Sequence, residues 1–149
     1  MKTIISLLAS VFLLCSTALA ADGLITKTSS HSVKQTLDNL EKIVKGKGFT
    51  VFTRINHAAA AQKIGATLRP TEVLIFGKPK LGSMLMQSNQ TIGIDLPVKV
   101  IVWEDEQGVV NIGYNDPAWL AKRHNITDRK KPFAKMTGAL KKFTDAAAQ

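Results

Sequence analysis

The chain has 149 residues, a formal net charge of +9 and one cysteine, and 45% of its residues are hydrophobic. A single cysteine excludes a disulfide framework within the chain. The length suits one packed domain, because a chain of this size buries roughly two thirds of its unfolded surface. The positive charge is concentrated near the C-terminus, since residues 122–142 hold eight lysine and arginine residues against Asp128 alone.

The first twenty residues have the three parts of a cleavable signal peptide. Lys2 supplies a positive start, residues 4–14 are apolar or small, and Ala18-Leu19-Ala20 is a pattern that signal peptidase accepts. The apolar run is shorter than the roughly 20 residues of a membrane-spanning helix. We therefore predict cleavage before Ala21, a single mature domain over residues 21–149, and a periplasmic or secreted location. Export also makes nucleic acid an unexpected partner for the basic segment.

The first half of the mature chain predicts two strands, each followed by a helix. Residues 24–29 alternate between apolar and polar, and Ser32 then opens a helix whose apolar positions recur to Val44 and which stops at Gly46. Residues 49–55 predict a second strand with a shared apolar face, followed by an alanine-rich helix over residues 57–64. The expected face consists of Phe49, Val51, Thr53 and Ile55.

The second half predicts three more strands and the longest helix. Residues 71–76 end in four consecutive apolar positions, which predicts a strand covered on both faces. One or two helical turns over residues 81–87 precede a hairpin of residues 98–103 and 109–114. Asp116-Pro117 begins a short helix, and a final helix starts near Thr127. We predict an α+β fold, a compact two-layer domain with a mainly antiparallel sheet of four or five strands and flanking helices.

Several short motifs, in order along the chain, resemble the domain of unknown function 302 family from about Leu24 to Phe143. They are Asn56-His57, Leu68-Arg69-Pro70-Thr71, Phe76-Gly77-Lys78-Pro79, Asp95-Leu96-Pro97, Trp103-Glu104-Asp105 and Tyr114-Asn115-Asp116-Pro117. The resemblance implies a compact α+β fold that tends to form a dimer, and it implies no established reaction. Asn56 and Lys78 depart from the family pattern, which usually has an acid and an asparagine there.

His57 is the first candidate for a functional side chain, because it lies at a strand-to-helix junction. It is either a metal ligand or proton carrier in a cleft, or it packs against the following helix. Together with Trp103 and Tyr114 it forms our candidate set for small-molecule binding, because such aromatics often shape ligand sites. Packing in the core is the alternative for both aromatics. His124 ends a short helix, where we expect a capping role.

Met84 and Met86 suggest a cuprous-ion site, because thioethers are soft ligands. His57 would complete the candidate metal set of His57, Met84 and Met86. On a strand the two methionines would share a face, whereas on a helix they would diverge by about 200°. We expect a helix, and core packing is the commoner role of methionine.

The sequence has no glycine-rich phosphate loop, no Gly-x-Ser-x-Gly elbow and no His-Glu-x-x-His motif. We therefore expect an exported, non-enzymatic binding or interaction module that is a homodimer, with an unidentified small-molecule ligand and no cofactor assigned. The alternative is a small hydrolase or a periplasmic protein that handles copper or zinc through His57. The basic C-terminal helix is expected to be a solvated face, or a surface for anionic membrane, through Lys130, Lys131, Lys135, Lys141 and Lys142.

Overall fold

A five-stranded antiparallel sheet with the order β1-β5-β4-β3-β2 lies at the centre of the structure. The structure is a computed structural model that describes residues 23–149, so the predicted signal peptide over residues 1–20 lies outside the described residues. The strands are β1 (Leu24–Thr28), β2 (Thr50–Asn56), β3 (Thr71–Gly77), β4 (Val98–Glu104) and β5 (Val110–Asn115). The helices are α1 (Val33–Gly46), α2 (His57–Gln62), α3 (Pro79–Ser88), the 3-10 helix η1 (Gln90–Ile94), α4 (Pro117–Arg123) and α5 (Lys130–Ala148).

Helix boundaries follow the local signals in the sequence. The Ser32 side chain accepts a hydrogen bond from the Gln35 amide at the start of α1, and Gly48 adopts a φ of +68° just beyond its end. The Asp116 side chain caps α4 in the same way, through the amide of Ala118. These short-range predictions are confirmed, as is the hairpin of β4 and β5.

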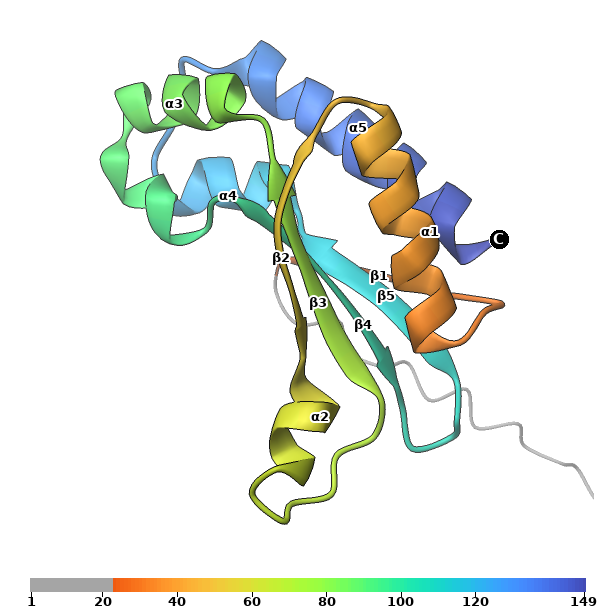
Figure 1. Ribbon diagram of the computed structural model, residues 1–149. Coiled ribbons are helices and arrows are strands. Elements are labelled where there is room, and N and C mark those ends of the chain that lie inside the picture. The colour runs from red at the N-terminus through yellow and green to blue at the C-terminus, as the bar shows by residue number, and fades with distance from the viewer. Residues whose placement is uncertain (1–22) are drawn as a thin grey trace, which may run out of the picture.

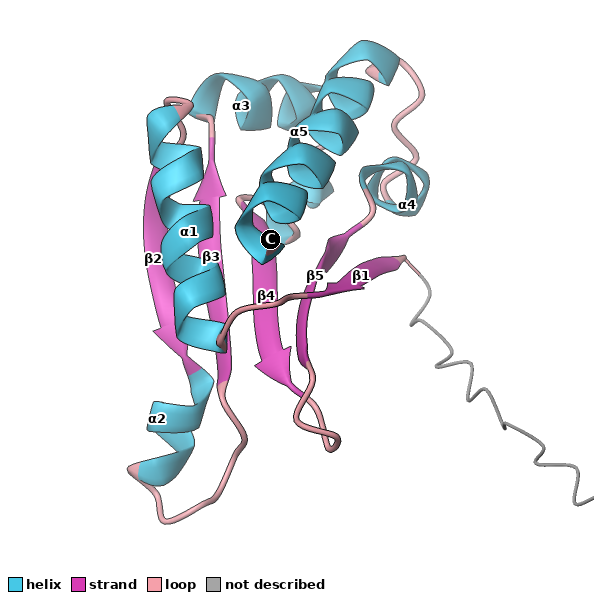
Figure 2. Cartoon of the chain, turned by 90° about the vertical axis from the view of Figure 1, so that its right-hand side faces the viewer, coloured by secondary structure: helices cyan, strands magenta, loops and turns pink. Residues whose placement is uncertain are grey.

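Helices α1 and α5 pack on one face of the sheet and form the core with it, while α2 and α3 lie at opposite ends of β2 and β3 (Figures 1 and 2). Leu37, Leu74, Val102 and Ile112 are fully buried in this core. The predicted α+β fold of two layers is confirmed, with five strands that are all antiparallel. Among residues 23–149 there is no helix with the length and hydropathy needed to span a membrane.

Strand β3 was expected to be covered on both faces, and the structure corrects this. Its side chains alternate between buried and half-buried, because α1 and α5 cover only one face of the sheet. The other face, here called the open face, carries Ile55, Val73, Ile75, Ile101 and Trp103 in paired positions of β2, β3 and β4. Consecutive apolar residues therefore indicate an apolar open face here rather than a second covering layer.

Strand β2 also differs from the prediction, because it contains a bulge. The register with β3 shifts between Val51 and Thr53, so Phe52 is an extra residue. Val51 consequently pairs with Phe76 on the helix side, whereas Ile55 pairs with Val73 on the open face. A bulge reverses the faces of all later side chains in a strand. The four residues expected to share one face are therefore divided between two.

Candidate functional site

The three residues proposed for small-molecule binding do not form one site in the structure. His57 is the exposed first residue of α2, and the helix is capped by the Asn56 side chain, which accepts from the Ala59 amide at 2.7 Å. Trp103 lies on the open face, where its ring contacts Gly113. Tyr114 is 3% exposed on the helix side of β5, and burial raises its pKa above the usual value. Trp103 and Tyr114 therefore lie on opposite faces of the sheet, so the three residues do not share one site.

The candidate metal residues are also separated. Met84 and Met86 lie on α3, and the predicted helix there is confirmed. Thr50 pairs with Gly77 just before α3, while His57 follows Asn56 at the other end of β2. The six residue steps between Thr50 and Asn56 correspond to about 20 Å of extended strand. Within residues 23–149, no group of three or more His, Cys, Asp or Glu side chains could hold a metal ion.

A cavity of about 560 Å³ lies between α3, α5 and the adjoining end of the sheet. Its walls come from four separate segments of the chain, and most of the lining side chains are apolar. The apolar lining residues are Phe49, Phe52, Phe76, Pro79, Leu81, Met86, Leu96, Pro97, Val98, Met136, Leu140 and Phe143. The volume falls within the roughly 300–1,000 Å³ of typical small-molecule sites.

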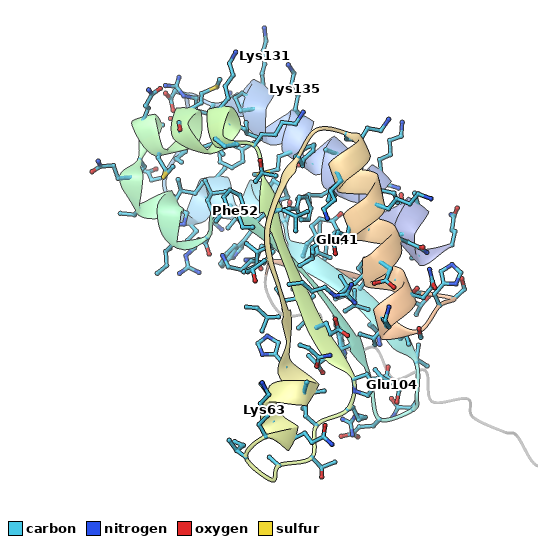
Figure 3. All side chains as sticks on the ribbon, viewed as in Figure 1. Glu41, Phe52, Lys63, Glu104, Lys131 and Lys135 are labelled. Carbon is cyan, nitrogen blue, oxygen red and sulfur yellow. The ribbon has the colours of Figure 1, made fainter. Side chains whose placement is uncertain are left out.

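Three phenylalanine rings pack against one another in one wall of the cavity. The ring of Phe49 meets those of Phe76 and Phe143 edge to face, with centroid distances of 5.9 and 5.4 Å. Such pairs are favourable because the positive edge of one ring meets the negative face of the other. The bulge residue Phe52 is 53% exposed and lines the cavity next to Gly77. Figure 3 shows Phe52 near the α3 end of the sheet and Lys63 at the opposite end.

The polar lining is sparse and carries positive charge. Lys78, Ser83 and Lys135 are the polar side chains in the lining, which contains no acidic residue. Lys78 Nζ lies 4.6 Å from the centroid of the Phe49 ring, a cation–π contact. Neither lysine forms a salt bridge within the described residues. The cavity therefore combines an apolar interior with two ammonium groups that no carboxylate neutralises.

A buried histidine anchors the segment that supplies another wall. His124 is the C-cap residue of α4, as expected, but its imidazole points inward: Nε2 lies 2.5 Å from Asp95 Oδ2 and Nδ1 lies 2.9 Å from Thr91 Oγ1. The Asn89 amide also donates to the His124 carbonyl at 2.8 Å. Asp95 directly precedes the lining residues Leu96 and Pro97. These bonds therefore tie η1 and the cavity wall to the end of α4.

A second polar network joins β2 to α1. Arg54 Nε donates to Glu72 Oε2 and Nη1 donates to Asp38 Oδ1, both at 2.6 Å. The Glu72 and Arg54 side chains are only 12% and 22% exposed. Hydrogen bonds from Lys34 and Arg54 lower the pKa of Asp38 below its usual value. The bulge at Phe52 is what turns Arg54 toward the helices.

Sequence reasoning missed the cavity, the Asp95–His124 pair and the Arg54 network. Each apolar lining residue has the spacing of an ordinary core residue, so no local pattern indicates that the packed segments leave a hollow. Asp95 and His124 are 29 positions apart. The one signal available was Asp95-Leu96-Pro97, which was noted as a motif without a partner for its carboxylate.

Comparisons with known proteins support the fold and the family. The sequence matches the family described as "Domain of unknown function DUF302" over residues 25–143. The crystal structure of uncharacterized conserved protein DUF302 from Bacillus stearothermophilus is similar, with a TM-score of 0.76 and 24% identity over 87% of this chain and 100% of that chain. Proteins from Brucella suis and Brucella abortus, both named "Fluoride-specific ion channel FluC 1", are 48% identical over 104 residues, or 70% of this chain. The match covers 41% and 38% of those proteins, so the chain spans about two fifths of their length.

Proposed function

This chain belongs to the DUF302 family, and we propose that it is an exported, non-enzymatic binding module that holds an apolar small molecule in the cavity. The observation that carries the proposal is the cavity itself, about 560 Å³ in volume and lined by twelve apolar side chains. Lys78, Ser83 and Lys135 supply its polar groups. This lining suits burial of an apolar ligand better than acid–base chemistry.

The similarity to part of the Brucella proteins supports a modular role. The matched 104 residues are a minority of those longer chains. A similar segment therefore occurs as one part of longer proteins, as expected of a module that is fused to other domains. The name of those relatives describes them as channels, and we propose no channel activity for this chain.

A fluorescent probe tests the proposal. N-phenyl-1-naphthylamine is neutral, apolar and brighter in apolar surroundings, so it should bind the parent protein with one site per chain. A Cβ at Gly82 would lie 3.9 Å from both Leu96 and Met86, so Gly82→Leu places its side chain in the cavity. Gly138→Leu is the matched control, because that helical glycine faces open space. We expect Gly82→Leu to lose probe binding and Gly138→Leu to keep it. Equal binding by both variants would contradict the proposal.

We further propose that the protein is a homodimer that buries the open face. This face places Ile101 between Val73 and Gly113 on its neighbouring strands. A second hollow of about 360 Å³ lies beside it and is lined in part by Ile101, Trp103 and Leu68. Leu68 is 47% exposed, and Ile64 in the segment after α2 is 82% exposed. Apolar side chains on a sheet face that no helix covers are typical of interaction surfaces, and a second copy is the usual partner of such a surface.

Light scattering measures the mass directly. The parent protein should have about twice the monomer mass at micromolar concentration. Ile101→Lys should give a monomer, because it replaces a central apolar side chain of the open face and adds a second positive charge beside Lys99. Ala134→Lys, at an exposed position of α5 in the helix layer, should leave the dimer intact. A monomeric parent, or a dimeric Ile101→Lys variant, would show that the open face is not the interface.

A further inference from the structure

We infer that the ligand of the cavity is a single-chain amphiphile with an anionic head group, such as a long-chain fatty acid. This inference rests on the proposed function and specifies the chemistry of the ligand. An apolar cavity alone does not distinguish a hydrocarbon from a lipid-like acid. The positive charges of the lining, and the position of the Lys78 ammonium group, favour the lipid-like acid.

The lining charges are all positive. Lys78 and Lys135 are the charged residues that line the cavity, and both are exposed. Neither has a carboxylate partner among the described residues, although Lys34, Lys45 and Lys141 elsewhere on the surface each form an ion pair. Figure 3 shows Lys131 and Lys135 projecting from the same end of α5, which adds further positive charge there. The two lysines therefore attract an anion at this opening, and no acidic side chain of the lining repels it.

The Lys78 ammonium is held beside the apolar wall. Its Nζ lies 4.6 Å from the centre of the Phe49 ring, and that ring packs on Phe143 inside the cavity. A head group bound to Lys78 would therefore be next to the place where an apolar tail enters. Apart from the two lysines, Ser83 is the polar side chain in the lining, so most of the interior offers no polar contact. One anionic head followed by an apolar chain matches this arrangement.

The depth of the cavity favours a ligand that has left a bilayer. Phe76, Met136 and Leu140 line it and are at most 5% exposed. An apolar chain that contacts these side chains is removed from water by the protein itself, and each buried methylene then adds a similar increment of binding. A membrane surface, by contrast, would contact only the exposed lysines.

Competition against the neutral probe N-phenyl-1-naphthylamine tests the inference. Dodecanoate, dodecanol and dodecylammonium share one chain length and differ in head-group charge, and all are used below their micelle-forming concentrations. We expect dodecanoate to bind about tenfold more tightly than dodecanol at low salt, a typical gain from a charge-assisted contact. This preference should shrink at high salt, and dodecylammonium should bind most weakly. Shortening the acid by one methylene should weaken binding about fourfold.

Lysine variants test whether Lys78 and Lys135 cause the preference for the acid over the alcohol. In Lys78→Gln/Lys135→Gln protein the Kd for dodecanoate should rise about tenfold while that for dodecanol stays unchanged. Lys142→Gln is the matched control, because Lys142 is an exposed lysine of α5 outside the lining, and it should change neither value. Equal binding of acid and alcohol by the parent would overturn the inference while leaving the proposed function intact. Binding to anionic vesicles without binding of monomeric dodecanoate would also overturn it. Failure of the neutral probe to bind would instead refute the proposed function.

Discussion

Replacing Arg54 by methionine should destabilise the protein, because it leaves a shielded carboxylate without its partner. Methionine keeps most of the apolar length of the side chain, so the change mainly removes charge and hydrogen bonds. Glu72 is 12% exposed and would keep only the Asn56 amide at 3.2 Å. Asp38 is 37% exposed and would keep its bond to Lys34 at 2.7 Å, so losing Arg54 costs little at this carboxylate, because water screens it. We expect a loss of about 2–4 kcal/mol in the free energy of unfolding, dominated by Glu72.

Urea denaturation measures this loss, and two further variants isolate its cause. Arg54→Met/Glu72→Gln should recover a large part of the stability, because no unpaired charge then remains near β3. Lys34→Met is the matched control, since its ion pair with Asp38 has a lysine that is 77% exposed and should contribute at most about 0.5 kcal/mol. A loss below about 0.5 kcal/mol in Arg54→Met would refute the reasoning, as would a double variant less stable than the single one.

The remaining predictions concern acid stability, the cavity wall, export and membrane association. The pKa of Asp38 is lowered from 3.8, so ionised Asp38 stabilises the protein above that pH. This stabilisation is lost as the pH falls through the pKa of the folded state. In an acid titration, Arg54→Met should therefore lose less stability over this pH range than the parent. His124→Phe removes the close partner of Asp95 and should cost about 2 kcal/mol in urea denaturation and weaken probe binding, and an unchanged variant would contradict the anchoring role. N-terminal sequencing of the protein from its own cell should begin at Ala21, and a product that retains Met1 would disprove cleavage. Sedimentation with anionic vesicles at low salt should exceed that with neutral vesicles and fall at high salt, since each base near an anionic surface contributes on the order of 1 kcal/mol; equal sedimentation would leave the lysines of α5 as a solvated face.

The parts of the fold that were predictable depend on interactions within a few residues. The cap at Ser32, the turn at Gly48 and the Asp116-Pro117 start of α4 are all determined locally. Hydrophobic spacing likewise located α1, whose Leu37, Leu40 and Val44 are buried. Interactions of this range leave a direct pattern in the sequence.

What could not be predicted depends on pairing between distant segments. The bulge at Phe52 exists only relative to the register of β3, and no single strand pattern contains that information. The expected face of Phe49, Val51, Thr53 and Ile55 leaves Arg54 on the opposite side of the strand, although in the structure it joins α1 to the sheet. The cavity is even harder to predict from the sequence, because it arises where the packing of α3 and α5 against the sheet leaves space. His57, selected from a motif, lies at the opposite end of β2 from that space.

Photo-crosslinking with a diazirine-bearing fatty acid identifies the residues that an anionic amphiphile contacts. We expect labelled peptides from α3 and from residues 135–143 of α5, at one label per chain. Labelling should disappear in Gly82→Leu and persist in Gly138→Leu. Labels concentrated on β4 residues of the open face, or labelling of Gly82→Leu equal to that of the parent, would contradict the claim that the cavity is the binding site.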